Sequence, residues 1–285
     1  MKATILVTGS NGQLGSELKK ISEKNDTYNF IFTDYKELDI TKSEEVNTFF
    51  EKNNINYVFN CAAYTAVDKA ESEEEKAYLI NATGVKHLAE ASHKFNAKLI
   101  SISTDYVYSG SNFTPYKEEE QTAPQSAYGR TKLAGEQEAL KYNNSIIIRT
   151  SWLYSEFGNN FVKTMIRLGT ERDKLSVVFD QIGTPTYAGD LAKAMMDIVD
   201  YSETKQFIAG IYNYSNEGVC SWYDFAKCIF ELKNIDCKLS PIETKDFPTP
   251  ASRPFFSVMN KAKIKNTFNI EIPHWHDSLK LLLTQ

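Results

Sequence analysis

Paired cysteines, long apolar runs and an excess of basic charge are all missing from this chain of 285 residues. Its four cysteines have no C-x-x-C spacing, so we expect reduced, structural thiols rather than a disulfide framework or a zinc site. No stretch approaches the roughly 18 to 20 apolar residues of a membrane span, and the N-terminus opens in a strand-like segment rather than a signal peptide. These absences predict a cytoplasmic protein with no membrane partner.

The charge balance argues against nucleic-acid binding. The chain carries 32 basic and 37 acidic residues, a formal net charge of -5, and has no long basic run. Its four histidines lack the spacing of metal ligands (His87, His93, His274 and His276). With 42% hydrophobic residues, the sequence predicts a globular protein of one large domain or two coupled ones.

Short apolar segments alternate with longer helical patterns through the first half of the chain. The strand-like segments are 4–8, 30–34, 57–60, 98–103 and 145–150, and the helical ones are 15–23, 43–53, 77–95 and 126–141. Thr41 and Glu44 have the spacing of a capping box. This repeated order predicts an α/β fold, a Rossmann-type doubly wound parallel sheet.

The alternation becomes irregular after Arg149, where a Gly-Asn-rich turn (157–160) and a Pro-rich stretch (241–254) occur. We predict a dinucleotide-binding domain over residues 1–150, to which a helix and a strand within 187–214 return. A smaller, C-terminal substrate-binding region is then made of residues 151–186 and 215–285.

Three glycines follow the first predicted strand and open the first helix, at Gly9, Gly12 and Gly15. Glycines there allow a tight turn and let backbone N–H groups at the positive end of the helix approach a pyrophosphate. Glycine also simply makes turns, but the strand before the loop and the amphipathic helix after it favour a dinucleotide site.

Two acidic residues are candidates for contacts with the adenosine half of the dinucleotide. Asp34 lies about twenty residues beyond the glycines, where a carboxylate accepts hydrogen bonds from the ribose and favours NADH. Lys36 can neutralise a 2'-phosphate, so both NADH and NADPH stay open. Asp39 can bind the adenine amino group while Ile40 covers the ring, although the two residues also fit a loop before a helix.

Tyr128 and Lys132 stand at positions i and i+4 of a predicted helix and therefore on one face. An ammonium near a phenol lowers the cost of forming phenolate, so the phenol can pass a proton to a developing alkoxide. Ser103, Thr104 and Asp105 end the fourth strand, where hydroxyls can hold a carbonyl oxygen. A solvated helix face explains a lone Tyr-x-x-x-Lys pattern, but the combination favours catalysis.

Several motifs resemble those of the dTDP-4-dehydrorhamnose reductase family within the extended short-chain dehydrogenase/reductases. Besides the glycines and the Tyr-x-x-x-Lys pattern, the matching segments are 60–71 (NCAAYTAVDKAE), 103–108 (STDYVY), 149–154 (RTSWLY), 183–186 (GTPT) and 253–254 (RP). The resemblance spans nearly the whole chain. It implies NADPH- or NADH-dependent reduction of the 4-keto group of dTDP-4-dehydro-L-rhamnose to dTDP-L-rhamnose, a precursor of polysaccharides.

The resemblance also assigns roles to individual residues. Tyr128 is the proton donor, with Lys132 and Thr104 as the other catalytic residues. The dinucleotide is expected to contact Gly12, Gln13, Leu14, Asp39, Ile40, Ala62, Ala63, Thr65, Tyr128 and Lys132. The dTDP-sugar is expected to contact Val67, Asp68, Thr104, Asp105 and Trp152. Without the family, the two aspartates would be interpreted as loop carboxylates and the tryptophan as core.

Magnesium at a homodimer interface is a further implication of the family, with acidic ligands partly from a C-terminal Trp-Glu pair. Here Trp275 is followed by His276, so the expectations of Mg²⁺ and of that dimer are weakened.

Three other functions are weighed against ketone reduction. A dehydratase would need two adjacent carboxylates after Thr104, and the sequence has Asp105 followed by Tyr106. Another nucleotide-sugar reductase or epimerase of the superfamily stays an alternative. A non-catalytic regulatory subunit that binds a dinucleotide is disfavoured, because it would not need Tyr128, Lys132 and Thr104 together.

Overall fold

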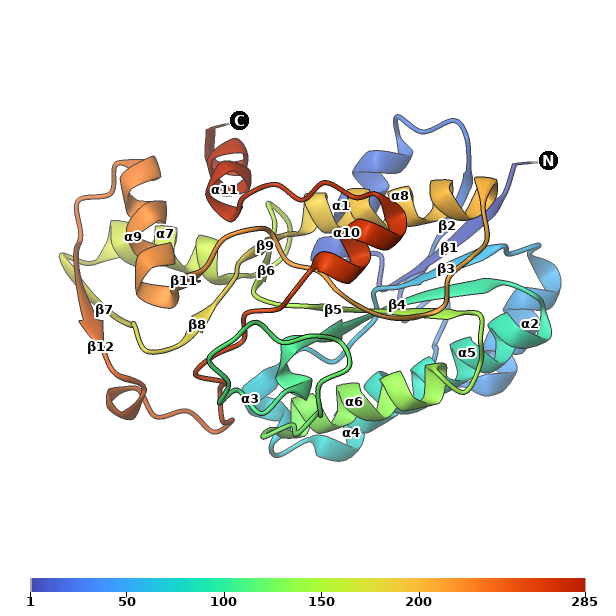
Figure 1. The fold of residues 1–285 in the computed structure, drawn as a ribbon, viewed down its shortest axis with the longest axis horizontal. Coiled ribbons are helices and arrows are strands. Elements are labelled where there is room, and N and C mark those ends of the chain that lie inside the picture. The colour runs from blue at the N-terminus through green and yellow to red at the C-terminus, as the bar shows by residue number, and fades with distance from the viewer. Residues whose placement is uncertain (1, 285) are drawn as a thin grey trace.

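The computed structural model describes residues 2–284, which are built around one six-stranded sheet (Figure 1). The strand order is β10-β5-β4-β3-β1-β2, and every neighbouring pair is parallel. The strands are β1 (Thr4–Thr8), β2 (Asn29–Phe32), β3 (Tyr57–Asn60), β4 (Lys98–Thr104), β5 (Ser145–Thr150) and β10 (Gly210–Asn213). The predicted Rossmann-type α/β fold is confirmed.

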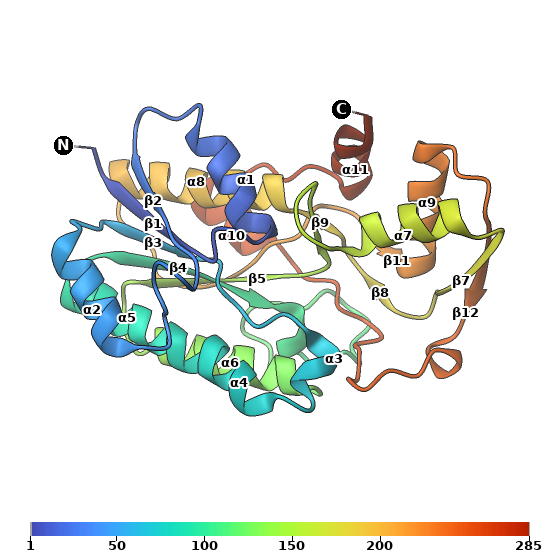
Figure 2. The same cartoon turned by 180° about the vertical axis from the view of Figure 1, so that it is seen from behind.

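Helices cover both faces of the sheet (Figures 1 and 2). One layer holds α1 (Gln13–Ser22), α8 (Ala188–Thr204) and α10 (Ala262–Phe268), and the other holds α2 (Ser43–Lys52), α5 (Val85–Lys94) and α6 (Ala127–Ala139). Alternate side chains of β1 pack into the apolar cores on the two faces of the sheet. Ile5 and Val7 pack with the first layer of helices, and Leu6 packs with the second. Burial on both faces explains the apolar residues at the centres of the strands, such as Ile5, Leu6 and Val7 of β1.

The helical stretch predicted over 77–95 is helical, but it includes an unexpected π-helical segment. It consists of α4 (Glu74–Tyr78), the π-helical η1 (Leu79–Gly84) and α5. The backbone of Asn81 lies against Gly135 of α6, where a Cβ would not fit. The predicted capping box was wrong, because α2 begins at Ser43 and the Thr41 hydroxyl donates to Asp39 instead, at 2.7 Å.

The C-terminal region contains more regular structure than its sequence pattern indicated. Its helices α7 (Phe161–Glu171), α9 (Trp222–Lys233) and α11 (Trp275–Thr284) share a separate apolar core. Short strands pair beside them: β6 (Leu153–Tyr154) with β9 (Thr186–Tyr187), β7 (Lys174–Val178) with β12 (Lys238–Ile242), and β8 (Ile182–Gly183) with β11 (Cys220–Ser221). No helix within residues 2–284 combines the length and apolarity needed to cross a bilayer.

The sheet reverses its strand order at β1. The chain passes from β1 to β2 on one side and then to β3 on the other. The carboxyl ends of β1 and β3 therefore form the switch point at which folds of this kind bind ligands in a crevice. Gly9 lies at this point with a φ of +63°. A Cβ on Gly9 would lie 2.6 Å from the backbone nitrogen of Ala62, the second residue after β3. Glycine is therefore required here both by the backbone conformation and by the close approach of two loops.

Replacing Gly9 by alanine is expected to lower the free energy of unfolding by about 1–3 kcal/mol, because the side chain meets backbone atoms in a left-handed conformation. Gly12→Ala is the matched control in the same loop. Its φ is -75°, and its nearest neighbour would be the Gly9 carbonyl oxygen at 3.3 Å. Urea denaturation of both variants measures the difference, and equal losses would contradict the assignment of strain to Gly9.

Candidate active site

The glycine loop and the N-terminus of α1 face the crevice. The N-cap of α1 is Gly12, which provides no side-chain cap for the first-turn N–H groups. Gly15 lies directly against Gly9 and Ser10, where a Cβ would come within 2.6 Å of the Gly9 carbonyl oxygen. The N–H groups at the positive end of α1 are uncapped, and the glycine loop in front of them carries no side chains that would block a ligand. This arrangement fits a diphosphate.

Leu14 and Gln13, both predicted to contact the dinucleotide, have side chains that point to different parts of the structure. Leu14 is buried in the apolar core below the loop. The Gln13 side chain instead accepts a hydrogen bond from Asn160 at 3.0 Å. This contact joins the glycine loop to the Gly-Asn-rich turn before α7, which the sequence had marked only as a break in the pattern.

Asp34 lies beside the glycine loop, as its predicted role requires. Its Oδ2 accepts a hydrogen bond from the backbone of Asn11 at 3.0 Å, and its Oδ1 accepts one from Tyr35 at 2.8 Å. The carboxylate is therefore fixed at the end of β2, next to the phosphate cradle, while Lys36 is exposed. Contact with the ribose stays a prediction.

Asp39 and Ile40 have evident structural roles of their own. The Oδ1 atom of Asp39 accepts hydrogen bonds from the backbone and the hydroxyl of Thr41, at 3.0 and 2.7 Å. Ile40 is buried against Gly84 of η1. The structure thus supports the alternative interpretation of a loop before a helix, and contact with adenine stays a prediction.

The loop after β3 provides the opposite wall of the crevice. Ala62 and Ala63 are half-buried directly beside Gly9, and Thr65 is exposed. The loop leads into α3 (Val67–Ala70), which carries two of the predicted substrate contacts.

Tyr128 lies in the first turn of α6, which the Ser126 side chain caps by accepting from the backbone of Gly129 at 3.2 Å. The Thr104 side chain, at the end of β4, lies close enough to the phenol to influence its pKa. Burial raises the pKa of Tyr128 to about 12, an effect opposed by Thr104 and assisted by the Asp105 charge. The phenol is therefore protonated at neutral pH and is placed to donate a proton.

Lys132 lies one turn further along the same face of α6. Its ammonium donates to the carbonyl oxygen of Ile102 at 2.7 Å, and the residue is 4% exposed. Burial lowers the pKa of Lys132 to about 8, so most molecules carry the positive charge at pH 7. The pKa of Tyr128 is set by burial, Thr104 and Asp105. The expected lowering of that pKa by Lys132 therefore stays a prediction.

Asp105 begins the short 3-10 helix η2 (Asp105–Val107) and is 2% exposed. Its Oδ1 accepts a hydrogen bond from the Thr104 hydroxyl at 3.0 Å, and Ser257 of the C-terminal region lies close to the carboxylate. Its Oδ2 is buried without a partner among residues 2–284. Burial raises the pKa of Asp105 to about 6. An orphaned carboxylate oxygen beside the phenol fits a hydroxyl group of a substrate.

Asp68 on α3 binds Arg253 across the cleft. The two guanidinium nitrogens Nη2 and Nη1 lie 2.7 and 3.1 Å from the carboxylate oxygens, and the backbone of Ala251 donates at 3.2 Å. The hydrogen bond with Arg253 holds the pKa of Asp68 below its usual range. Sequence analysis had marked Arg253 only as part of a motif, because its partner lies 185 positions away.

Trp152 has a left-handed backbone, with a φ of +47°. Its indole stacks on that of Trp222 at a centroid distance of 3.5 Å and an angle of 10°. The ring edge lies over Gly183, where a Cβ would come within 2.7 Å. One face of the indole is therefore occupied by a neighbour, so a sugar would have to use the remaining surface.

Ser103 does not face the phenol as the sequence suggested. Its hydroxyl donates to Glu136 on α6 at 2.5 Å, so Thr104 is the hydroxyl of this motif that lies beside Tyr128. Glu136 was missed because a glutamate within a helix is usually solvated, and this one is buried.

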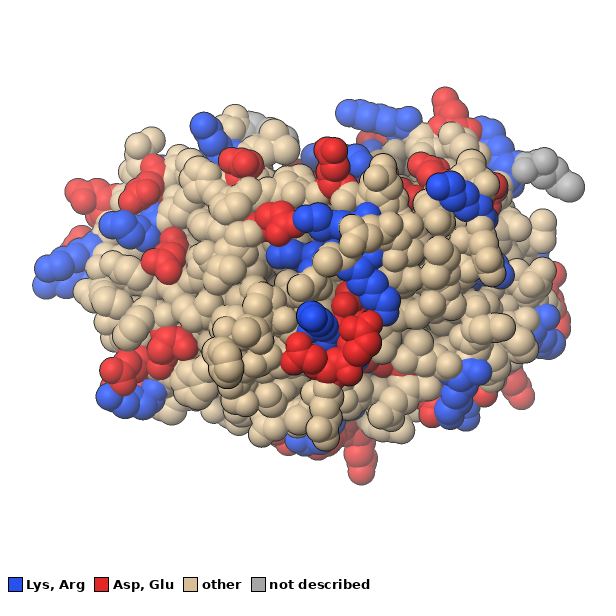
Figure 3. Space-filling model, in the orientation of Figure 1, with Lys and Arg blue, Asp and Glu red and all other residues tan. Residues whose placement is uncertain are grey.

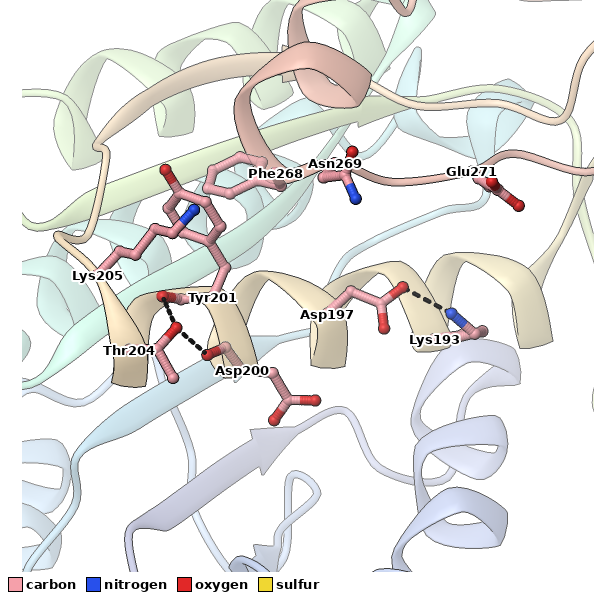
Figure 4. Close-up of a pocket in the computed structure, with 9 residues that line it drawn as sticks. All are labelled: Lys193, Asp197, Asp200, Tyr201, Thr204, Lys205, Phe268, Asn269 and Glu271. Carbon is pink, nitrogen blue, oxygen red and sulfur yellow. Dashed lines mark hydrogen bonds and ion pairs between the residues drawn. The ribbon is translucent and has the colours of Figure 1, made fainter.

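No group of three or more His, Cys, Asp or Glu side chains within residues 2–284 has an arrangement that would hold a metal ion. On the face in Figure 3, acidic and basic side chains are interspersed. A groove lies between α8 and the segment after α10 (Figure 4). It is separate from the predicted site, and its lining residues are Lys193, Asp197, Asp200, Tyr201, Thr204, Lys205, Phe268, Asn269 and Glu271.

Comparison with known proteins identifies the family of the chain. The family model described as the RmlD substrate binding domain matches residues 1–285. A dTDP-4-dehydrorhamnose reductase of Aggregatibacter actinomycetemcomitans is 42% identical over 289 residues, which covers 98% of this chain and 97% of that protein. The chain belongs to the dTDP-4-dehydrorhamnose reductase family. The resemblance noted in the sequence is thus confirmed.

Two solved structures of this reductase family have the same fold. The crystal structure of the Clostridium acetobutylicum protein is 45% identical, has a TM-score of 0.94 and matches over 99% of this chain and 98% of that chain. The Bacillus anthracis protein, solved in complex with NADP, is 42% identical with a TM-score of 0.94, over 100% of this chain and 99% of that one.

Asp105→Asn is expected to stabilise the protein while impairing its proposed activity. The raised pKa means that the folded protein holds the proton more tightly than the unfolded chain, so stability falls as pH rises from about 4 to about 6. Above pH 6 the variant should therefore be more stable than the wild type by about 1–3 kcal/mol. Urea denaturation at pH 7.5 and pH 4 should show this gain at the higher pH and its loss at the lower one. A gain that is independent of pH would contradict the titration of Asp105.

Proposed function

We propose that this protein uses NADPH or NADH to reduce the 4-keto group of dTDP-4-dehydro-L-rhamnose, forming dTDP-L-rhamnose. The observation that carries the proposal is the placement of a protonated phenol, the nearby Thr104 hydroxyl and an orphaned carboxylate oxygen at the edge of the sheet that also holds the glycine loop. Membership of the reductase family over residues 1–285 supports the choice of substrate.

In this mechanism the bound dinucleotide supplies a hydride to the carbonyl carbon. Tyr128 donates its phenolic proton to the carbonyl oxygen as the alkoxide forms, which completes the hydroxyl group. Thr104, which lies near the phenol, orients it. The Lys132 ammonium, one turn further along α6, stabilises the phenolate left behind. Asp105 accepts a hydrogen bond from a sugar hydroxyl through its Oδ2 atom.

The two substrates are assigned to different parts of the chain. We place the dinucleotide on residues 1–150 with 187–214, since β10 pairs with β5 and α8 packs on α1. We place the sugar nucleotide on residues 151–186 and 215–285, from which Arg253 binds Asp68 on α3 and Ser257 lies close to Asp105. Both substrates are small molecules, and the proposal puts the reaction in the cytoplasm.

The decisive assay combines the purified protein with dTDP-4-dehydro-L-rhamnose and either NADH or NADPH, followed at the nicotinamide absorbance. Mass spectrometry and NMR should identify dTDP-L-rhamnose without dehydrated or epimerised products. Parallel reactions with EDTA and with Mg²⁺ test whether turnover requires the metal. Turnover of a different nucleotide sugar alone would refute the substrate, and a stoichiometric enzyme partner with no turnover of any sugar would favour a regulatory subunit.

Tyr128→Phe should retain dinucleotide binding and lose about 100- to 10,000-fold in turnover, because it removes the proton donor and keeps the ring. The matched control is Tyr142→Phe, a tyrosine that packs on His93 rather than in the cleft. Turnover numbers at saturating substrate and dinucleotide affinities by fluorescence titration measure the two effects. Turnover of Tyr128→Phe equal to that of the wild type would remove the phenol from the mechanism.

Asp34→Ala should shift the preference between reductants toward NADPH, because the carboxylate beside the glycine loop repels a 2'-phosphate. The wild type is expected to use both reductants, with Lys36 offsetting part of the repulsion. The ratio of kcat/KM for NADPH and NADH measures the preference in each variant. A wild type that ignores NADH altogether would show that Asp34 does not contact the ribose.

A further inference from the structure

Tyr106 is the second residue of η2, and the reduction described above gives it no role. Its ring forms a T-shaped pair with the ring of Tyr128, with the centroids 5.6 Å apart and an angle of 76° between the planes. Aromatic pairs prefer this arrangement, because the positive edge of one ring meets the negative face of the other. The contact therefore favours one orientation of the Tyr128 ring.

The backbone of Tyr106 contacts two further parts of the site. Its N–H donates to the hydroxyl oxygen of Thr104 at 3.3 Å. Its carbonyl oxygen lies directly against Gly129, the residue after Tyr128, where a Cβ would not fit. Tyr106 thus touches the hydroxyl that lies near the phenol, the ring that carries the phenol and the first turn of α6.

The apolar cluster beneath the Tyr128 ring is built mostly from alanines. Its buried members are Ala70, Ala77 and Ala127, with Tyr64 and Tyr128 packed against them. A methyl group gives a ring little contact area and no preferred angle. Tyr106 is therefore the neighbour whose shape can set the angle of the Tyr128 ring.

We propose that Tyr106 is a positioning residue that holds the phenol of Tyr128 in the orientation from which it donates a proton. Tyr106 acts through its ring and through the first turn of α6. The catalytic consequence rests on the proposed reduction, in which Tyr128 donates to the carbonyl oxygen. A displacement of about 1 Å at a reacting group can cost about 100-fold in rate, so a loosely held phenol is a poor donor.

Tyr106→Leu removes the ring and fills much of its space, and it should lower kcat by about 10- to 100-fold with little change in either KM. Tyr106→Phe keeps the ring and should retain the kcat of the wild type. In a Tyr128→Phe background, Tyr106→Leu should cause no further loss of the residual turnover, because no phenolic proton is left to position. A loss by the same factor in both backgrounds would indicate a merely structural role and would overturn the proposal.

The matched control is Tyr201→Leu, which removes a T-shaped pair outside the site. Tyr201 contacts Phe268 at a centroid distance of 5.3 Å and an angle of 89°, in the groove beside α8. This variant should leave kcat unchanged.

A measurement without substrate separates this proposal from the proposed function. NMR of the full chain carrying ¹³C-labelled tyrosine reports the rate at which the Tyr128 ring flips, and Tyr128→Phe assigns its signals. The flip should be about tenfold faster in Tyr106→Leu and unchanged in Tyr106→Phe and Tyr201→Leu, because a packed ring turns only when its neighbours move aside.

A folded Tyr106→Leu variant with the flip rate of the wild type would overturn the proposal, and so would a Tyr106→Phe variant that is as impaired as Tyr106→Leu. If Tyr106→Leu does not fold, Tyr106→Met, which fills irregular space with a flexible side chain, carries the same expectations. A faster flip in a protein that reduces no sugar would support the role of Tyr106 and refute the proposed function alone.

Discussion

Parallel pairing of the strands is the constraint on which the site depends. Because all six strands of the sheet run in one direction, every strand ends at the same edge. That edge collects Gly9 after β1, Asp34 after β2, Ala62 after β3 and Thr104 at the end of β4. Residues spread over almost a hundred positions are thus brought together by backbone hydrogen bonds alone. To form the site, the residues at the ends of the strands need only have polar or small side chains.

Burial is the second determinant of the chemistry. It raises the pKa of Tyr128 and Asp105 and lowers that of Lys132, each away from the charged form. The same low polarity strengthens the interaction of any charge that develops in the cleft with its fixed neighbours. In the C-terminal region, Arg253 pairs with Asp68 on α3, and Ser257 lies close to Asp105.

The sequence predicted the parts of the fold that have strong periodicity. The central strands and their helices were placed to within a few residues, because strands buried on both faces are continuous apolar runs. The π-helical segment at Asn81 could not be foreseen, since it depends on the distant Gly135. Dependence on residues that are distant in the sequence also limits what could be predicted of the site. Tyr128, Thr104 and Lys132 follow local motifs, whereas Glu136 and Arg253 gain their meaning from partners that no local pattern reveals.

The position of β10 has a consequence for how the chain folds. This strand pairs with the outer edge of β5, although it lies about sixty residues later in the sequence and is therefore synthesised later. Until it arrives during synthesis, β5 presents unpaired backbone groups beside the consecutive apolar residues Ile146, Ile147 and Ile148. An open strand edge of this composition is a template for aggregation. Without β10, the first 150 residues, although they contain the phenol and the lysine, would therefore expose an edge that favours aggregation.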